Sequence, residues 1–354
     1  MSKRKQKKSS LKPLLLLLLL TAVLLIIATY AWFTANPNVS VKAMNVHVDA
    51  QNGLEISTDG SNWKAMVTTD EILAENGATT SYPGAVNQIP EVLNPVSTVG
   101  ELNAVNGYLK MFKVDVQPDE TSGQYMLTAS SDLEQNVNDT QGNFIAFDLF
   151  FKVDQGEEVV LDGASGAGVT YNGVGSSKGV ENYSRVAFVV EGNRPNGTSL
   201  ATIQGLKEAT ASDVYIWEPN ADTHTTTGVA AAYDSYGIGG LTAGTGNATL
   251  SYSGIKAPIL STNKLPLNQN PLPPDGTGTF DSAAWTAYLA AVTTIPTPAS
   301  YAGTTQTIFT LQSGITKVRV YCWLEGQDAD CENSASGQDI LFNLAFVSGS
   351  SLVP

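Results

Sequence analysis

Short alternating segments separated by turn residues dominate the sequence after residue 38. The clearest is Ile315–Leu324, in which apolar residues at every second position from Val318 to Leu324 alternate with Lys317, Arg319 and Tyr321. A period of two places each set on its own face of a strand. Many such strands, with Gly, Asn, Asp and Pro between them, are typical of β-sandwiches and jelly rolls.

The same criteria predict other strands and little helix. Phe144–Val153 is apolar on both faces, which indicates a central strand. The segment 39–50 changes phase near Ala43–Met44, which predicts a β-bulge or break. We expect a short helix near Asp70–Ala74 and a longer one over Asp281–Val292. The remaining predicted strands are Leu54–Ser57, Tyr108–Val116, Gln124–Ala129, Val159–Leu161, Arg185–Val190, Val214–Trp217, Thr307–Leu311 and Ile340–Val347.

These patterns predict an all-β chain, a jelly-roll-like β-sandwich with large loop insertions, preceded by an N-terminal hydrophobic helix. The insertions are Gly163–Gly179, Asp222–Gly246 and Pro258–Gly278, which are rich in Gly, Ser, Thr or Pro. Residues 34–354 are too many for one small sandwich. One elaborated sandwich and two β domains are therefore both open.

The N-terminal segment predicts export. Six basic residues lie within residues 1–12, and residues 13–33 are mostly apolar. This order is that of a secretory signal, and the apolar run is also long enough to cross a bilayer of ~30 Å as an anchor. Cleavage between Ala31 and Trp32 would release the body. Without cleavage the basic end stays cytoplasmic, so the body is extracellular or on the cell surface in both cases.

The body is acidic. Outside the first twelve residues, 13 Lys and Arg stand against 33 Asp and Glu. Such a surface repels phosphate backbones, so we expect no nucleic-acid partner.

The only two cysteines, Cys322 and Cys331, are separated by eight residues. Because an exported chain meets an oxidising environment, we expect a local disulfide; the alternative is two unpaired thiols.

Carboxylates gather just after the last alternating position of Ile315–Leu324. Glu325, Asp328 and Asp330 offer the hard oxygen ligands that Ca²⁺ prefers. The spacing lacks the loop glycine and the terminal Glu of an EF-hand. A solvated hairpin tip is the favoured interpretation, and a calcium site is the alternative; no other cofactor is expected.

No constellation of residues predicts catalysis. The histidines, His47 and His224, are far apart and belong to no His-Glu-x-x-His motif. The Gly175–Gly179 segment has the letters of a nucleophile elbow around Ser177, but neither a strand before it nor a helix after it. We therefore expect a protein that is not an enzyme.

The signal exit, Thr29-Tyr30-Ala31-Trp32-Phe33-Thr34, resembles that of TasA and camelysin-type exported proteins of Gram-positive bacteria. The resemblance covers 25 to 30 residues. It implies jelly-roll subunits that assemble into extracellular fibres of the biofilm matrix, each completing the sheet of the next with an N-terminal donor strand. Here that strand falls within Trp32–Ala50, and Pro37 departs from the pattern. Its apolar residues are Val39, Val41, Met44, Val46 and Val48.

The leading hypothesis is thus an exported structural protein of the cell surface, partnered by its own copies or other surface proteins and by the membrane through its N-terminal segment. The alternative is a membrane-anchored adhesin, a module that binds glycan or protein through loops and aromatics such as Trp63, Trp217 and Tyr236. A secreted hydrolase is the least favoured.

Overall fold

The computed structural model describes residues 39–48, 53–73, 81–118, 125–135, 137, 139–164, 167–173, 175–226, 228, 252–266, 286–298, 305–328, 330–331 and 336–349. The predicted basic segment, the hydrophobic segment 13–33 and the Ala31–Trp32 cleavage point lie outside these ranges. No helix within the ranges is both long and apolar enough to cross a membrane.

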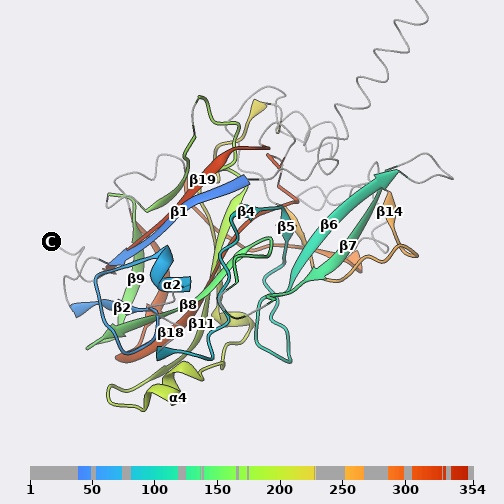
Figure 1. Cartoon of the computed structure of the whole chain (residues 1–354). Coiled ribbons are helices and arrows are strands. Elements are labelled where there is room, and N and C mark those ends of the chain that lie inside the picture. Colours follow the sequence, from blue (N-terminus) through green and yellow to red (C-terminus); the bar gives the residue numbers. More distant parts are fainter. Residues whose placement is uncertain are drawn as a thin grey trace, which may run out of the picture.

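The protein is all-β, as predicted. Two large sheets account for most of the described strands (Figure 1). Sheet A has the order β17-β9-β19-β1-β3, with β10 also on β19 and β4 also on β1. Its strands are β1 (Val39–Val48), β3 (Met66–Thr68), β4 (Val92–Leu93), β9 (Glu157–Asp162), β10 (Gly168–Tyr171), β17 (Thr305–Leu311) and β19 (Asp339–Ser348).

Sheet B has the order β16-β12-β11-β18-β8-β2, and its longest strands lie at its centre. Its only parallel pair in the described chain is β12 with β16. The strands are β2 (Glu55–Ser57), β8 (Ile145–Val153), β11 (Ser184–Arg194), β12 (Val214–Glu218), β16 (Ile295–Pro296) and β18 (Gly314–Leu324).

The main hydrophobic core lies between sheets A and B. Phe151 and Phe188 of sheet B each contact Phe309 and Phe346 of sheet A, with ring centroids 5.3 to 5.7 Å apart. All four side chains are buried. Face-to-face packing of two sheets around one core is the defining feature of a sandwich, because each sheet hides its apolar face against the other.

Sheet B is buried on its second face as well. Tyr321 and Trp323 of β18 pack there against Val96, Leu109 and Met111 from the segment that covers the sheet. This explains why β8 is apolar on both faces and confirms the predicted central strand: every residue of β18 and all but one of β8 are buried.

A smaller sheet C extends from this covering segment. Its order is β14-β7-β6-β5, and the long hairpin of β6 and β7 projects away from the sandwich (Figure 1). Phe112 and Leu127 pack there against Ile255 and Leu289 in a separate hydrophobic cluster. Sheet C consists of β5 (Val96–Ser97), β6 (Met111–Pro118), β7 (Tyr125–Asp132) and β14 (Leu265–Pro266). A separate two-stranded sheet is formed by β13 (Ser253–Ile255) and β15 (Leu289–Ala291).

Helices are few and short. The expected helix near Asp70 is α2 (Thr69–Leu73), and two unpredicted ones are α4 (Leu200–Gln204) and the 3₁₀ helix η2 (Ala211–Asp213). The predicted helix over Asp281–Val292 is wrong where the structure describes it. Leu289–Ala291 is strand β15, paired with β13, because burying Leu289 against Ile255 outweighs the local helical pattern.

β1 is an interior strand of sheet A. It runs parallel to β19 from Ser40 beside Asp339 to Val48 beside Phe346, and antiparallel to β3 and β4 on its other edge. The register shifts between Val41 and Ala43, close to the predicted phase change. The predicted donor residues Val39, Met44, Val46 and Val48 are buried in the core, and Val41 packs against it.

Candidate functional site

The candidate site forms at one end of sheet B, where three chain segments meet. β12 and β18 both run antiparallel to β11 and flank it on either side. The segments that follow β12 and β18 therefore emerge at the edge where β11 begins. The first carries His224 and the second carries Asp328 and Asp330, while Arg185 is the second residue of β11.

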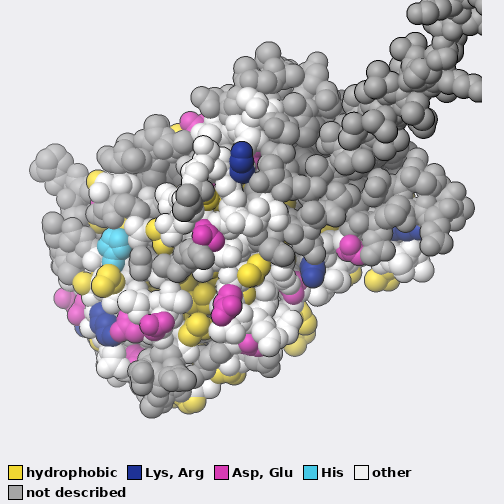
Figure 2. Space-filling view, turned by 45° about the horizontal axis from the view of Figure 1, so that its top comes forward, with side chains coloured by type: hydrophobic (Ala, Val, Ile, Leu, Met, Phe, Trp, Pro, Cys, Tyr) yellow, Lys and Arg dark blue, Asp and Glu magenta, His cyan; other side chains and the backbone are white. Residues whose placement is uncertain are grey.

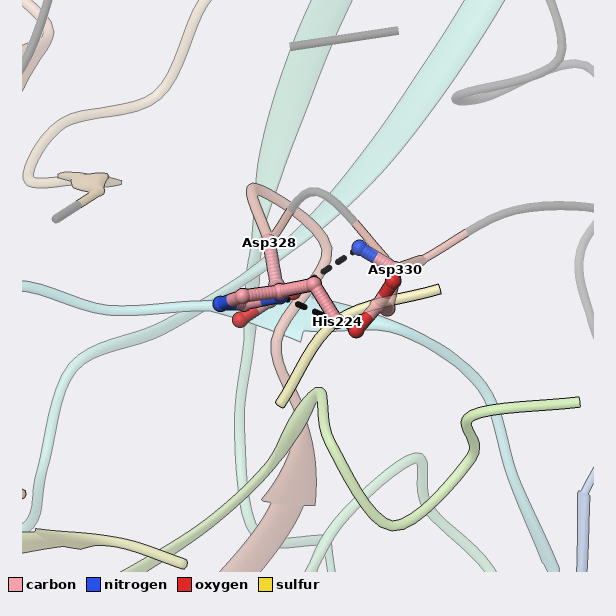
Figure 3. A group of neighbouring side chains, drawn as sticks. All are labelled: His224, Asp328 and Asp330. Carbon is pink, nitrogen blue, oxygen red and sulfur yellow. Dashed lines mark hydrogen bonds and ion pairs between the residues drawn. The ribbon is translucent and has the colours of Figure 1, made fainter. Parts of the chain in front are cut away.

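His224 points at the two carboxylates (Figure 3). Its Nδ1 lies 3.0 Å from Oδ2 of Asp330 and 3.9 Å from Oδ1 of Asp328. One potential ligand atom from each of the three residues lies within 4.8 Å of the others. All three residues are buried. The arrangement is a compact triad of one imidazole and two carboxylates, closed off from bulk solvent.

Both aspartates are oriented by further hydrogen bonds. Oδ1 of Asp330 accepts bonds from the backbone N–H and the hydroxyl of Thr225, at 2.8 and 2.9 Å. Asp328 accepts a bond from the backbone N–H of Asp330 through Oδ1 and pairs with Arg185 through Oδ2, 2.5 Å away. These contacts fix the aspartates in position, leaving Oδ2 of Asp330 directed at His224.

Arg185 supplies the positive charge beside the triad. Its guanidinium contacts Glu218 at 2.7 Å as well as Asp328, and it stacks on the Tyr252 ring. Glu325 lies nearby and adds a further carboxyl. We call this set the edge cluster: Arg185, Glu218, His224, Glu325, Asp328 and Asp330.

The favoured prediction of a solvated hairpin tip is wrong. Glu325, Asp328 and Asp330 are at most 2 % exposed, because Val96 of the covering segment bonds the backbone of Gly326 and Thr225 bonds Asp330. Glu325 is also not part of the triad: its carboxylate accepts bonds from the Trp323 indole and the Gln327 backbone. Two of the three predicted ligands therefore come together, with His224 in place of the third.

Burial and charge shift the protonation equilibria in opposite ways around the cluster. Burial disfavours the charged form of His224, but the hydrogen bond and charge of Asp330, with Asp328, leave its pKa above the usual value. Burial raises the pKa of Asp328, and it raises that of Glu325 to about 7. The environment is thus rich in carboxylates and short of cations.

Several polar atoms around the triad have no partner among the described residues. They are Nε2 of His224, the Tyr183 hydroxyl and the Gln327 side-chain amide nitrogen, all buried. Burial raises the pKa of Tyr183 well above the usual value, and the charges of Cys331, Asp328 and Asp330 raise it further. Buried unsatisfied groups gathered in one place indicate that another species belongs there.

The chain from Gly175 to Gly179 packs against this site. The backbone of Gly179 has a φ of +86°, and an added Cβ would meet Thr225 at 2.7 Å, so only glycine fits there. The Ser177 hydroxyl accepts a bond from the Gly179 N–H and donates to Glu181. The nucleophile-elbow letters therefore belong to a tight turn whose Gly179 lies beside the triad.

The predicted disulfide is wrong. Cys322 and Cys331 are both buried thiols and are not at bonding distance. Cys322 faces the main core from β18, where burial raises its pKa to well above the usual range. Cys331 lies beyond the turn that carries Asp328 and Asp330, so the alternative of two unbridged cysteines holds.

A second group of buried charges lies further along sheet B. Lys317 pairs with Asp148 at 3.1 Å and with Glu191 at 2.7 Å, and Arg319 pairs with Asp148 at 2.6 Å and with Glu134. Lys317 also donates to two backbone carbonyls, those of residues 204 and 206. We call these five residues the central cluster.

A surface groove of about 400 Å³ lies beside sheet C. Tyr108, Lys110, Glu134, Lys256 and Pro258 are among its lining residues. On the face shown in Figure 2, Lys and Arg side chains lie singly among acidic and neutral ones and form no continuous basic patch.

No protein-family model, curated protein or solved structure matches this chain.

Sequence reasoning missed His224 as a member of the site. It treated His224 as a loop residue without a partner, because the carboxylates it meets lie over a hundred residues later. The available signal was that two predicted strands, Val214–Trp217 and Ile315–Leu324, are each followed closely by acidic residues. Only the strand order shows that both segments leave at the same edge.

Proposed function

We propose that this protein is an exported structural component of the cell surface whose copies assemble by exchanging strand β1. The proposal includes a hydrophobic helix over residues 13–33 and a jelly-roll connectivity for the sandwich. Export rests on the basic and apolar leader of the sequence. Assembly rests on one observation, the position of β1.

Strand β1 occupies a position in sheet A that the same strand from another copy would occupy equally well. It is hydrogen-bonded along both edges, to β19 and to β3 and β4, and its apolar side chains complete the main core. Without β1 the sheet would expose two unpaired edges and part of the core. An identical strand from a neighbour would restore all these contacts, so intramolecular and exchanged states differ little in energy.

An engineered disulfide that holds β1 in its own sheet, and that can be reduced, tests assembly. Asn45 and Asn343 are directly paired between β1 and β19, so an N45C/N343C double variant would tie β1 to its own sheet when oxidised. We expect electron microscopy of the full-length protein to show filaments when the variant is reduced and none when it is oxidised. The single variants N45C and N343C serve as controls for oxidation alone.

Filaments formed equally by the oxidised, intramolecularly bridged protein would exclude exchange of β1. N-terminal sequencing of protein taken from the cell surface tests the leader separately. Trp32 as the first residue means cleavage, Met1 or Ser2 means a retained anchor, and recovery only from the cytosol would refute export.

The groove beside sheet C favours a second candidate, a glycan- or protein-binding module. Tyr108 lines this groove among polar and charged groups, a composition that suits sugar binding, and its ring already carries Lys207 and Arg319 at 4.4 and 4.6 Å. Of the aromatics predicted for this role, Trp217 is buried, Trp63 lies beneath Lys152, and Tyr236 lies outside the described residues. Binding to a glycan array that is lost in Tyr108→Ala and kept in Trp63→Ala would support this candidate.

A further inference from the structure

We propose that His224, Asp328 and Asp330 bind one divalent cation of the zinc type, which joins the segment after β12 to the segment after β18. The site is independent of the proposed assembly. Four observations support it: the ligand geometry, the charge balance, the unsatisfied neighbours and the burial of the triad.

The spacing of the donor atoms suits a small cation. Nδ1 of His224 lies 3.0 Å from Asp330 and 3.9 Å from Asp328. Ligands held about 2.0–2.2 Å from a tetrahedral Zn²⁺ are separated by distances of this order. A cation between them would replace the proton that Nδ1 shares with Asp330, and binding would release that proton.

The donor set selects the kind of metal. One imidazole nitrogen with two carboxylate oxygens suits Zn²⁺ and similar transition metals. Ca²⁺ takes six to eight oxygen ligands, and the described triad offers a nitrogen and few oxygens. The calcium alternative drawn from the acidic sequence is therefore replaced by a different metal class, on two of the same carboxylates.

The charges of the edge cluster are short of a cation. Arg185 and His224 face four carboxyl groups. Buried carboxylates without full compensation are costly, and a divalent cation compensates them directly.

The unsatisfied polar atoms mark the same place. The Tyr183 hydroxyl has no hydrogen-bond partner within the described chain although it lies in the field of Asp328 and Asp330. Nε2 of His224, on the triad itself, is likewise buried without a partner among the described residues. His224 and Asp330 are at most 3 % exposed, so the site is closed to substrates and its role is structural.

Metal retention by the full-length protein in detergent tests the proposal. After EDTA treatment, the protein is loaded with Zn²⁺, desalted and analysed by elemental mass spectrometry. We expect one Zn²⁺ per chain, with Ca²⁺ and Mg²⁺ not retained. His224→Gln should weaken Zn²⁺ binding by more than about 100-fold, since even residues behind the ligands change affinity 10–100-fold.

The chain supplies its own matched control. His47→Gln removes the other histidine, which lies on β1, and should leave Zn²⁺ binding unchanged. Equal retention by the wild type and the His224→Gln variant would overturn the proposal, as would a wild type that retains no Zn²⁺ or prefers Ca²⁺.

A spectroscopic measurement covers the case in which His224→Gln does not fold. The X-ray absorption spectrum of zinc bound to the wild type should show one imidazole and otherwise oxygen ligands. A sulfur ligand, or an oxygen-only shell, would overturn the assignment.

Discussion

The two buried charge clusters of sheet B share strands β11 and β18 but differ in how far the protein itself compensates them. In the central cluster Lys317 and Arg319 face three carboxyls, and burial together with the charge of Asp148 raises the pKa of Glu191 to about 7. Protonation of that one group brings the charges close to balance. The edge cluster has one more carboxyl, and its second basic group is an imidazole.

This difference teaches how to separate a structural network from a binding site when both are buried. A network whose charges are matched within the chain needs nothing further. One that keeps unmatched carboxylates within the described chain points to an external cation. Four changes test the contrast, beginning with the largest expected effect.

Arg319→Met should destabilise the protein by about 3–5 kcal/mol, because Asp148 and Glu134 lose their guanidinium partner while remaining buried. Chemical denaturation followed by circular dichroism measures the change. Added Zn²⁺ should not restore the loss, since the central cluster has no imidazole among its described groups. Restoration by Zn²⁺ would contradict the contrast between the clusters.

Zn²⁺ removal should have the next largest effect. At a concentration 100 times the dissociation constant, a ligand that binds only the folded state adds about 2.7 kcal/mol of stability. Thermal unfolding with Zn²⁺ and with EDTA measures this increment. It should be the same in Arg319→Met, because the clusters are separate, and absent in Asp330→Asn. An increment that survives in a folded Asp330→Asn variant would argue against the triad.

Glu191→Gln should change the pH dependence of stability. The carboxyl has a pKa near 4.5 when unfolded and about 7 when folded, so between these values only the folded state binds the proton. Wild-type stability therefore falls as pH rises through this window. At pH 8 the variant should be more stable by about 1–3 kcal/mol. Denaturation of both proteins at pH 5 and pH 8, with Glu101→Gln as an exposed control, provides the measurement; parallel profiles would contradict it.

Lys110→Met should have the smallest effect. Lys110 pairs with Glu101 at 2.9 Å, but both side chains are well exposed. Solvent screening limits such pairs to about 1 kcal/mol or less. The same denaturation assay should give a change several-fold below that of Arg319→Met. A comparable loss would mean that burial does not distinguish these ion pairs.

Strand positions were largely predictable from the sequence, whereas the site was not. Ile315–Leu324 and Phe144–Val153 became β18 and β8 almost unchanged, because alternation and continuous apolar character report burial directly. The covering of sheet B by the 82–111 segment was not predicted, and it turned an expected exposed tip into a buried site. The spacing of residues within one strand carries no information about which distant segment of the chain will cover it.

Smaller features were likewise predictable when they depend on local sequence and not predictable when they depend on distant pairing. The register shift of β1 was predicted within a residue or two, since it leaves a change of phase in the sequence. The strand character of Leu289–Ala291 was not, because it depends on pairing with residues more than thirty positions earlier. His224 shows the extreme case, a loop histidine whose role depends on the order of three strands.

Strand β1, the first described strand, pairs in parallel with β19, the last one, and this pairing can form only after nearly the whole chain has been synthesised. Val46 lies beside Leu344, so the longest partner of the first described strand is synthesised nearly three hundred residues after it. During that interval β1 has made few of its native contacts, and long-range pairings of this kind form slowly. Until β19 has been synthesised, β1 can pair within its own chain only along the edge that β3 and β4 occupy.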